Sequence, residues 1–222
     1  MKKSKGILSA ICFLWISLTA FAQENDFGSW FSVELSGKLT KNLSAEFEEE
    51  IRLFQNMGKI DRLLTSPGIN YKISKFLKTG VGYAWIYGND LNDEVWRNRH
   101  RFYGYVQGKA ELGRFTFSLR ERFQTTFYKE KKQQYRNYLR SKLEVDYDIR
   151  GFKGEPYLAA EMHNRLNNPD GNRIENLRYT LGMQYPFSKK LAIDGFLRLN
   201  QDINVKNPVN MFIVGACLKI DL

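Results

Sequence analysis

Hydrophobic and polar residues alternate along most of this chain with a period of two. In the clearest segment, 114–127, phenylalanine and leucine predominate at odd positions and polar residues fill the even ones, with Glu121 as the one charge on the apolar side. Spacings of three or four mix charged and apolar side chains here, so the pattern predicts β-strands and not helices. Six further segments alternate in the same way: 42–53, 77–88, 97–110, 136–149, 176–185 and 212–222. Weaker candidates at 27–37, 60–73, 156–165 and 191–202 bring the count to eleven strands.

The connections between these segments are of two kinds. Short turns are expected near 38–41, 74–76, 113, 151–154 and 188–190, and mostly longer, polar loops near 55–59, 88–94, 128–133, 167–172 and 205–207. This alternation is typical of an up-and-down barrel whose two rims face different compartments. We therefore expect an all-β, antiparallel transmembrane β-barrel of about 10 to 12 strands, with its C-terminus on the periplasmic rim. Because single-chain bacterial barrels have an even number of strands, we expect either 27–37 or 156–165 to be misread.

The first residues have the pattern of a secretory signal peptide. Three lysines precede an apolar run at 7–21 that ends next to the small residue Ala22. The run is shorter than the roughly 20 residues of a transmembrane anchor, the alternative reading. We expect a signal peptide at 1–22 and one outer-membrane barrel domain at 23–222, in a Gram-negative bacterium. Cleavage removes three positive charges, which lowers the formal net charge from +10 to +7, and leaves Cys217 as the only cysteine, so no intrachain disulfide can form.

One face of the expected strands is rich in charge, and a barrel directs that face into its lumen. The candidate lumen residues are Glu46, Glu48, Glu50, Arg52, Arg62, Arg97, Arg99, Arg101, Arg120, Arg122, Arg140 and Arg178, with Glu144 beside them. Two readings remain open. Arginine and glutamate can pair across a narrow interior, where an unpaired charge is costly. Alternatively, the excess arginine can select anions in a small pore, because rings of charge set ion preference.

Catalytic chemistry has few candidates in this sequence. The chain has two histidines, His100 and His163, and no cysteine–histidine spacing of the kind that binds zinc, so we expect no metal, no cofactor and no enzymatic activity. A lipid-acting enzyme is kept as an alternative with His100 as its base, although neither Ser118 nor Ser141 can be paired with it without the strand register. His163 is expected to face the lumen or a loop.

Tyrosines and tryptophans scattered along the expected strands are expected to form girdles at the membrane interfaces. These are Trp30, Tyr83, Trp85, Tyr87, Trp96, Tyr179 and Tyr185. Arginines inside strands, together with the signal peptide, argue against nucleic-acid binding. The architectural rival is a soluble barrel, which the mean hydropathy of −0.47 permits, with Phe115, Phe117, Leu119 and Phe123 lining a ligand cavity. The long strands favour the membrane barrel, since a tilted strand needs about 9 to 11 residues to cross a bilayer.

Several short motifs resemble a family of uncharacterised bacterial outer-membrane β-barrels, catalogued as a domain of unknown function. They are Trp30, the run 43–52, Asp61-Arg62, and the segments 67–73, 78–83, 97–101, 120–122 and 139–143. Each motif is short, but together they span nearly all of the barrel domain. The resemblance implies an outer-membrane location and assigns no chemistry.

Three functions therefore remain open. The first is a narrow, anion-preferring pore lined by arginine and glutamate. The second is a structural or partner-binding barrel with a plugged lumen, and the third is a lipid-acting enzyme. The ten-to-twelve-strand size lies between side-chain-filled barrels of about eight strands and open porins of about sixteen, so wide diffusion is not expected. The expected partners are outer-membrane lipid, the barrel-assembly machinery during insertion, and a small solute or anion.

Overall fold

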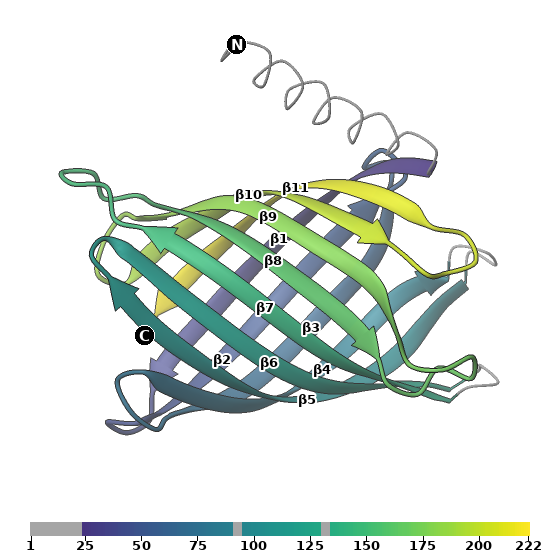
Figure 1. Cartoon of the computed structure of the whole chain (residues 1–222), viewed down its shortest axis with the longest axis horizontal. Coiled ribbons are helices and arrows are strands. Elements are labelled where there is room, and N and C mark those ends of the chain that lie inside the picture. The colour runs from purple at the N-terminus through teal and green to yellow at the C-terminus, as the bar shows by residue number, and fades with distance from the viewer. Residues whose placement is uncertain (1–23, 91–94, 130–133) are drawn as a thin grey trace, which may run out of the picture.

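The computed structural model describes residues 24–90, 95–129 and 134–222, in which eleven strands form one closed barrel (Figure 1). The strands are β1 (Glu24–Lys38), β2 (Leu43–Phe54), β3 (Lys59–Lys72), β4 (Leu77–Asp90), β5 (Val95–Leu112), β6 (Phe115–Tyr128), β7 (Tyr135–Tyr147), β8 (Glu155–Arg165), β9 (Arg173–Pro186), β10 (Leu191–Asp202) and β11 (Val209–Asp221). The expected all-β barrel is confirmed. The expected signal peptide lies outside the described residues. Within them, no helix is long and apolar enough to cross a membrane.

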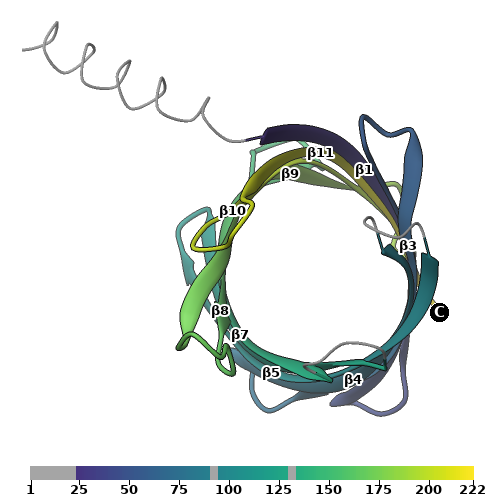
Figure 2. The same cartoon turned by 90° about the vertical axis from the view of Figure 1, so that its right-hand side faces the viewer.

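The ring closes through one parallel pair of strands. Each of the other neighbouring pairs is antiparallel, but β1 and β11 run parallel, from Glu24 opposite Val209 to Ser36 opposite Asp221. Figure 2 shows β1 and β11 side by side in the ring. In an odd-numbered up-and-down series the first and last strands point the same way, so only a parallel pair can close it. The expectation that one strand is misread is therefore wrong, because 27–37 and 156–165 belong to β1 and β8.

The two ends of the barrel carry different connections. The short-turn rim carries 39–42, 73–76, 113–114, 148–154 and 187–190, together with the end of β11. The long-loop rim carries 55–58, 166–172, 203–208, the β4–β5 and β6–β7 connections, and the start of β1. As expected, the C-terminus lies on the short-turn rim. Two connections are exceptions. The connection 148–154 is longer than the other turns on its rim, and 55–58, on the long-loop rim, has the same length as 39–42, 73–76 and 187–190.

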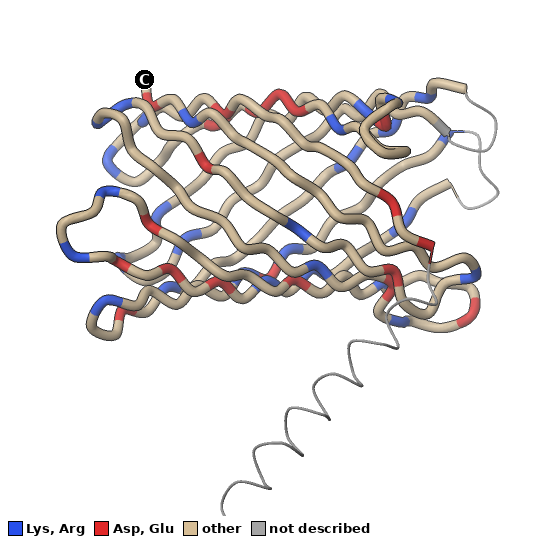
Figure 3. Tube along the Cα trace, turned by 90° about the horizontal axis from the view of Figure 1, so that it is seen from above, with Lys and Arg blue, Asp and Glu red and all other residues tan. Residues whose placement is uncertain are grey.

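Apolar side chains cover the outside of the barrel. Leu119 and Leu181 are each 53% exposed, and the same outward face continues around the ring through Leu143, Leu158 and Leu197. Most charged residues of the same strands alternate with them, and many of these line the lumen. Figure 3 shows where the charged positions lie along the strands. This arrangement is the reverse of the soluble alternative, in which the apolar face lines a cavity.

Aromatic pairs lie on the outer face towards both rims. Tyr87 stacks on Trp96 near the long-loop rim, with ring centroids 4.9 Å apart, and Phe115 packs on Tyr147 near the short-turn rim at 4.8 Å. Trp30 is an exception to the expected girdle. It is only 4% exposed and lies inside the lumen, because it shares the inward-facing even positions of β1 with Ser32 and Glu34.

Small residues on the inner face of β4 make room for tyrosines from the next strand. A Cβ atom at Gly82 would collide with the Tyr103 ring, and one at Gly80 would collide with Tyr105. The register explains these contacts, since Gly82 lies opposite Tyr103 and Gly80 opposite Tyr105. The tyrosines can therefore lie flat across β4, and the lumen is filled unevenly around its circumference.

Candidate functional site

The lumen contains a central chamber of about 400 Å³. Nine of the twelve sequence-predicted lumen residues line it: Glu46, Glu48, Glu50, Arg52, Arg101, Arg120, Arg122, Arg140 and Arg178. The other three do not. Arg62 and Arg97 each lie opposite Gly88, and Arg99 lies opposite Ile86, which places all three nearer the long-loop rim.

Several residues of the chamber were not predicted from the sequence. They are Trp30, Glu34, Lys78, Lys142, Asp194, Arg198 and Lys219, among others. Most come from β1, β10 and β11, whose charged inner positions were not included in the charge ladder. A usable signal was present in β10, where Asp194, Phe196 and Arg198 alternate with Ile193 and Leu197.

Glu161 on β8 holds arginines from three strands. Its side chain is 5% exposed and accepts three hydrogen bonds from Arg140, at 2.8 to 3.1 Å, and one from Arg178 at 3.2 Å. Arg120 Nη2 lies 3.6 Å away, and His163 Nε2 lies 3.4 Å away. A buried carboxylate is stable in such a setting because its charge is paired and its lone pairs are satisfied. Glu161 thus neutralises part of the charge of three guanidinium groups.

Three other arginines have no carboxylate within ion-pair distance among the described residues. They are Arg101, Arg122 and Arg198. Arg101 and Arg198 each donate from Nε to a threonine hydroxyl at 3.0 Å. The Arg122 guanidinium lies over the Tyr103 ring at 3.7 Å, and its Nε has no hydrogen-bond partner. An uncompensated guanidinium is costly in a dry interior, so this part of the lumen needs water or anions.

Trp30 is surrounded by arginines. The guanidinium carbon of Arg52 lies 3.7 Å from the indole ring centroid, and those of Arg178 and Arg198 lie at 5.0 and 4.9 Å. Cation–π attraction accounts for the position of these guanidinium groups around the ring. Arg52 also forms an ion pair with Glu50 at 2.6 Å, so part of its positive charge is already compensated within the barrel.

Positive charge exceeds negative charge in the chamber. Ten lysines and arginines line it, against five aspartates and glutamates. Some acids are engaged locally: Asn70 donates to Glu46 at 2.6 Å, and Lys219 lies 3.5 Å from Asp194. Even when the buried Glu161 is counted, the basic groups outnumber the acidic groups by four. The described side chains of the chamber therefore carry a net positive charge.

A family model described as a protein of unknown function, DUF2490, matches residues 27–211. The chain belongs to the DUF2490 family. The match runs from β1 into β11, so the resemblance to a family of unknown function, inferred from short motifs, is confirmed. No curated protein matches the sequence.

The two histidines of this DUF2490 barrel lie on opposite faces of its wall. His100 faces outward, and its Nδ1 lies 2.7 Å from the hydroxyl of Tyr83. Of the serines considered as its partners, Ser118 is buried on the inner face, and Ser141 donates to Glu121 on the outer face at 2.7 Å. His163 faces the lumen beside Glu161. Among the described residues, no group of three His, Cys, Asp or Glu side chains is arranged to hold a metal ion.

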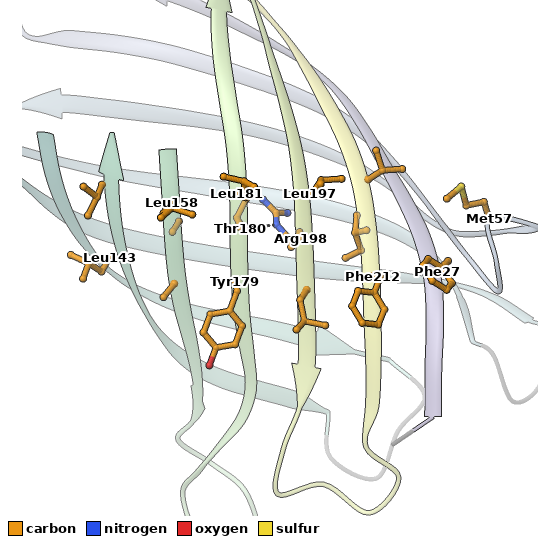
Figure 4. Close-up of a pocket in the computed structure, with 16 residues that line it drawn as sticks. Phe27, Met57, Leu143, Leu158, Tyr179, Thr180, Leu181, Leu197, Arg198 and Phe212 are labelled. Atoms are coloured by element: carbon orange, nitrogen blue, oxygen red, sulfur yellow. Dashed lines mark hydrogen bonds between the residues drawn. The ribbon is translucent and has the colours of Figure 1, made fainter. Parts of the chain in front are cut away.

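The outer wall of the DUF2490 barrel has a shallow apolar groove of about 760 Å³. It crosses β7 to β11 and β1, and Figure 4 shows the side chains of Leu158, Leu181, Leu197 and Phe212 along it. Arg198 lies at the same level on the inner face and donates to Thr180 (Figure 4). The wall here is a single β-sheet, with apolar side chains on its outer face and the guanidinium group of Arg198 on its inner face.

Proposed function

We propose that this DUF2490 protein is an outer-membrane barrel whose lumen passes small anions through a narrow pore. The membrane location is supported by the outward apolar face and by the aromatic pairs near both rims, which match the band and girdles of outer-membrane barrels. In this proposal the short-turn rim faces the periplasm, as such turns do in that class of barrel.

The observation that carries the pore is the set of arginines without carboxylate partners. Arg101, Arg122 and Arg198 enter the central chamber from three different strands. If the lumen were a sealed plug, each charge would bear a desolvation cost of several kcal/mol, on the order quoted for buried ions. A water-filled path removes this cost and lets the excess positive charge attract anions.

The size of the chamber limits what can pass. A volume of about 400 Å³, crowded by tyrosines and long basic side chains, suits small hydrated anions and not oligosaccharides or peptides. Binding must also be weak enough for the ion to leave. Glu46, Glu48 and Glu50 line the same chamber and limit the depth of the positive potential.

Ion selectivity in planar bilayers tests this proposal. Purified, refolded protein is inserted under a salt gradient, and the reversal potential is measured for wild type and for the triple variant Arg101→Gln, Arg122→Gln, Arg198→Gln. The control removes the same charge from exposed turns, with Arg114→Gln, Arg150→Gln and Lys189→Gln. Wild type and control are expected to prefer anions, and the lumen variant is expected to lose that preference. Insertion without conductance would rule the pore out.

A structural barrel with a plugged lumen is the second candidate, favoured by the ordered ion pairs on β8 and β9. Glu175 accepts hydrogen bonds from Tyr138 at 2.6 Å, from Arg165 at 3.1 Å and from Asn168 at 2.6 Å. Together with Glu161, it ties β7, β8 and β9 together within the lumen. Insertion into bilayers without ion steps is the result that this candidate predicts.

A further inference from the structure

A second hollow lies at the short-turn mouth of the barrel, where the β1–β2 and β3–β4 hairpins meet β5. It has a volume of about 310 Å³. Six lysines line it: Lys38, Lys41, Lys72, Lys75, Lys78 and Lys109. The rest of the lining is uncharged and includes Thr40, Ser44, Ser74, Asn42, Asn70, Gln107, Leu43, Leu77 and Phe76. We call this the lysine hollow.

The backbone holds the lysine hollow in a fixed shape. The amide of Lys72 donates to the carbonyl of Asn42 at 2.8 Å, which ties the β3–β4 hairpin to the β1–β2 turn. The amide of Lys109 donates to the carbonyl of Phe76 at 2.8 Å, which ties β5 to the β3–β4 turn. Three segments that are distant in sequence are therefore joined edge to edge. A ligand finds the hollow already formed, which lowers the entropy cost of binding.

The positions of two of these lysines are expected to lower the stability of the barrel. Lys72 and Lys78 lie directly opposite each other across β3 and β4, and strand alternation puts both on the inward face. Like charges that face each other directly across a sheet are destabilising. Such a pair is explained if a bound anion lies between the two ammonium groups.

Little negative charge within the barrel offsets these lysines. Among the described residues, Lys109 alone of the six makes an ion pair, with Glu111 at 3.0 Å on the exposed rim. Lys75 and Lys78 contact aromatic rings instead, those of Phe76 and Tyr105. Within the described part of the chain, five of the six lysines thus have no carboxylate at ion-pair distance, although Glu34 interacts with Lys78 and Asp146 with Lys109 over a longer distance.

The chemistry of lysine indicates the class of ligand. Ammonium groups are compact, strongly hydrated point charges that bind phosphate well, whereas a single monovalent ion gains little from several of them at once. A multivalent oxyanion can accept from several lysines and from the neutral donors Ser44, Asn42 and Gln107. The inward positions of Lys72, Lys78 and Lys109 turn these groups towards the aqueous mouth and away from the outer surface.

We infer that the lysine hollow binds a soluble, phosphate-bearing solute at the short-turn mouth. Lys78 and Gln107 line both the hollow and the central chamber, so the bound solute lies at the entrance to the lumen. Binding in the hollow does not depend on conduction through the chamber. A barrel that fails to conduct ions still binds phosphate at this mouth.

Equilibrium dialysis with radiolabelled inorganic pyrophosphate tests this inference. The protein is held in nanodiscs of zwitterionic phosphatidylcholine at fixed ionic strength. The test variant is Lys72→Gln, Lys75→Gln, Lys78→Gln, and the control is Lys153→Gln, Lys189→Gln, Lys190→Gln, which removes the same charge from other turns of the same rim. The test variant is expected to bind at least about tenfold more weakly than wild type, because three charged donors are lost. The control is expected to stay close to wild type.

Three results would overturn the inference. If the wild-type protein binds no pyrophosphate, the hollow is not a phosphate site. If the control variant loses as much affinity for pyrophosphate as the test variant, the ligand is attracted by the overall charge of the rim and not by the hollow. The third result concerns the source of the phosphate. If nanodiscs containing phosphatidylglycerol abolish pyrophosphate binding to wild type, the hollow belongs to a lipid headgroup and not to a soluble solute. Unchanged binding in those nanodiscs supports the soluble ligand.

Discussion

Replacing Glu161 with glutamine tests how far the arginines of the lumen depend on one carboxylate. Glu161 receives hydrogen bonds from Arg140 and Arg178 and lies within 3.6 Å of Arg120. Glutamine keeps the shape of the side chain, but it removes the negative charge and places an amide NH₂ next to a guanidinium donor. The substitution therefore isolates the electrostatic contribution from packing.

The magnitude follows from burial. The side chains of Glu161, Arg140 and Arg178 are 5%, 10% and 13% exposed, so solvent screens their interaction weakly. Removing one partner of such a pair costs about 3 to 5 kcal/mol, because the remaining charge stays buried without compensation. That cost lowers the folded-to-unfolded ratio by about 100-fold to about 4,000-fold. If the chamber is filled with water, as proposed, the expected value lies at the lower end.

The measurement is reversible unfolding in urea, followed by tryptophan fluorescence in lipid vesicles. Glu144→Gln is the matched control, because Glu144 pairs with the single flexible lysine Lys142 and is more exposed. We expect a clear fall in the urea midpoint for Glu161→Gln, at an unchanged slope, and a much smaller fall for the control. Equal midpoints for the two variants would refute the assignment of Glu161 as the charge that organises the arginines.

Other substitutions test the outer face, the packing inside and one turn. Leu197→Arg, on the outer wall, is expected to cost about 2 to 4 kcal/mol in vesicles if that wall faces lipid; no loss of stability would contradict a membrane location. Gly82→Val is expected to lower the urea midpoint by displacing Tyr103, whereas Gly108→Val, with open space around its Cβ, is expected to leave it unchanged; equal effects would reject the steric account. Asp26→Ala removes the acceptor for two amides of the 55–58 turn at 2.9 and 3.0 Å. It is expected to cost about 1.5 to 3 kcal/mol in the same urea assay, and an unchanged midpoint would show that the turn holds without it.

Period-two alternation was sufficient to find the strands and most of the lumen face. Strand neighbours at a spacing of two share a face whatever their partners are, so the inward positions of Arg120 and Arg122 follow from local sequence. The same rule puts Trp30 on one face with Ser32 and Glu34, but the prediction placed Trp30 in an interfacial girdle. The lumen position of Trp30 is a case in which periodicity was the better guide.

Strand pairing depends on residues that are far apart in the sequence, and it determined how the barrel closes and which side chains meet inside it. The sequence by itself determined an all-β chain with one charged and one apolar face, because these features depend only on neighbouring residues. The parallel closure of β1 on β11 required the tertiary structure, since its partners are separated by nearly the whole chain. Only the fold brings three arginines to Glu161, and only the stagger of three hairpin ends gathers six lysines at one mouth. In each case the geometry arises from the pairing register, which depends on turn geometry and on the partner strand as well as on the local alternation.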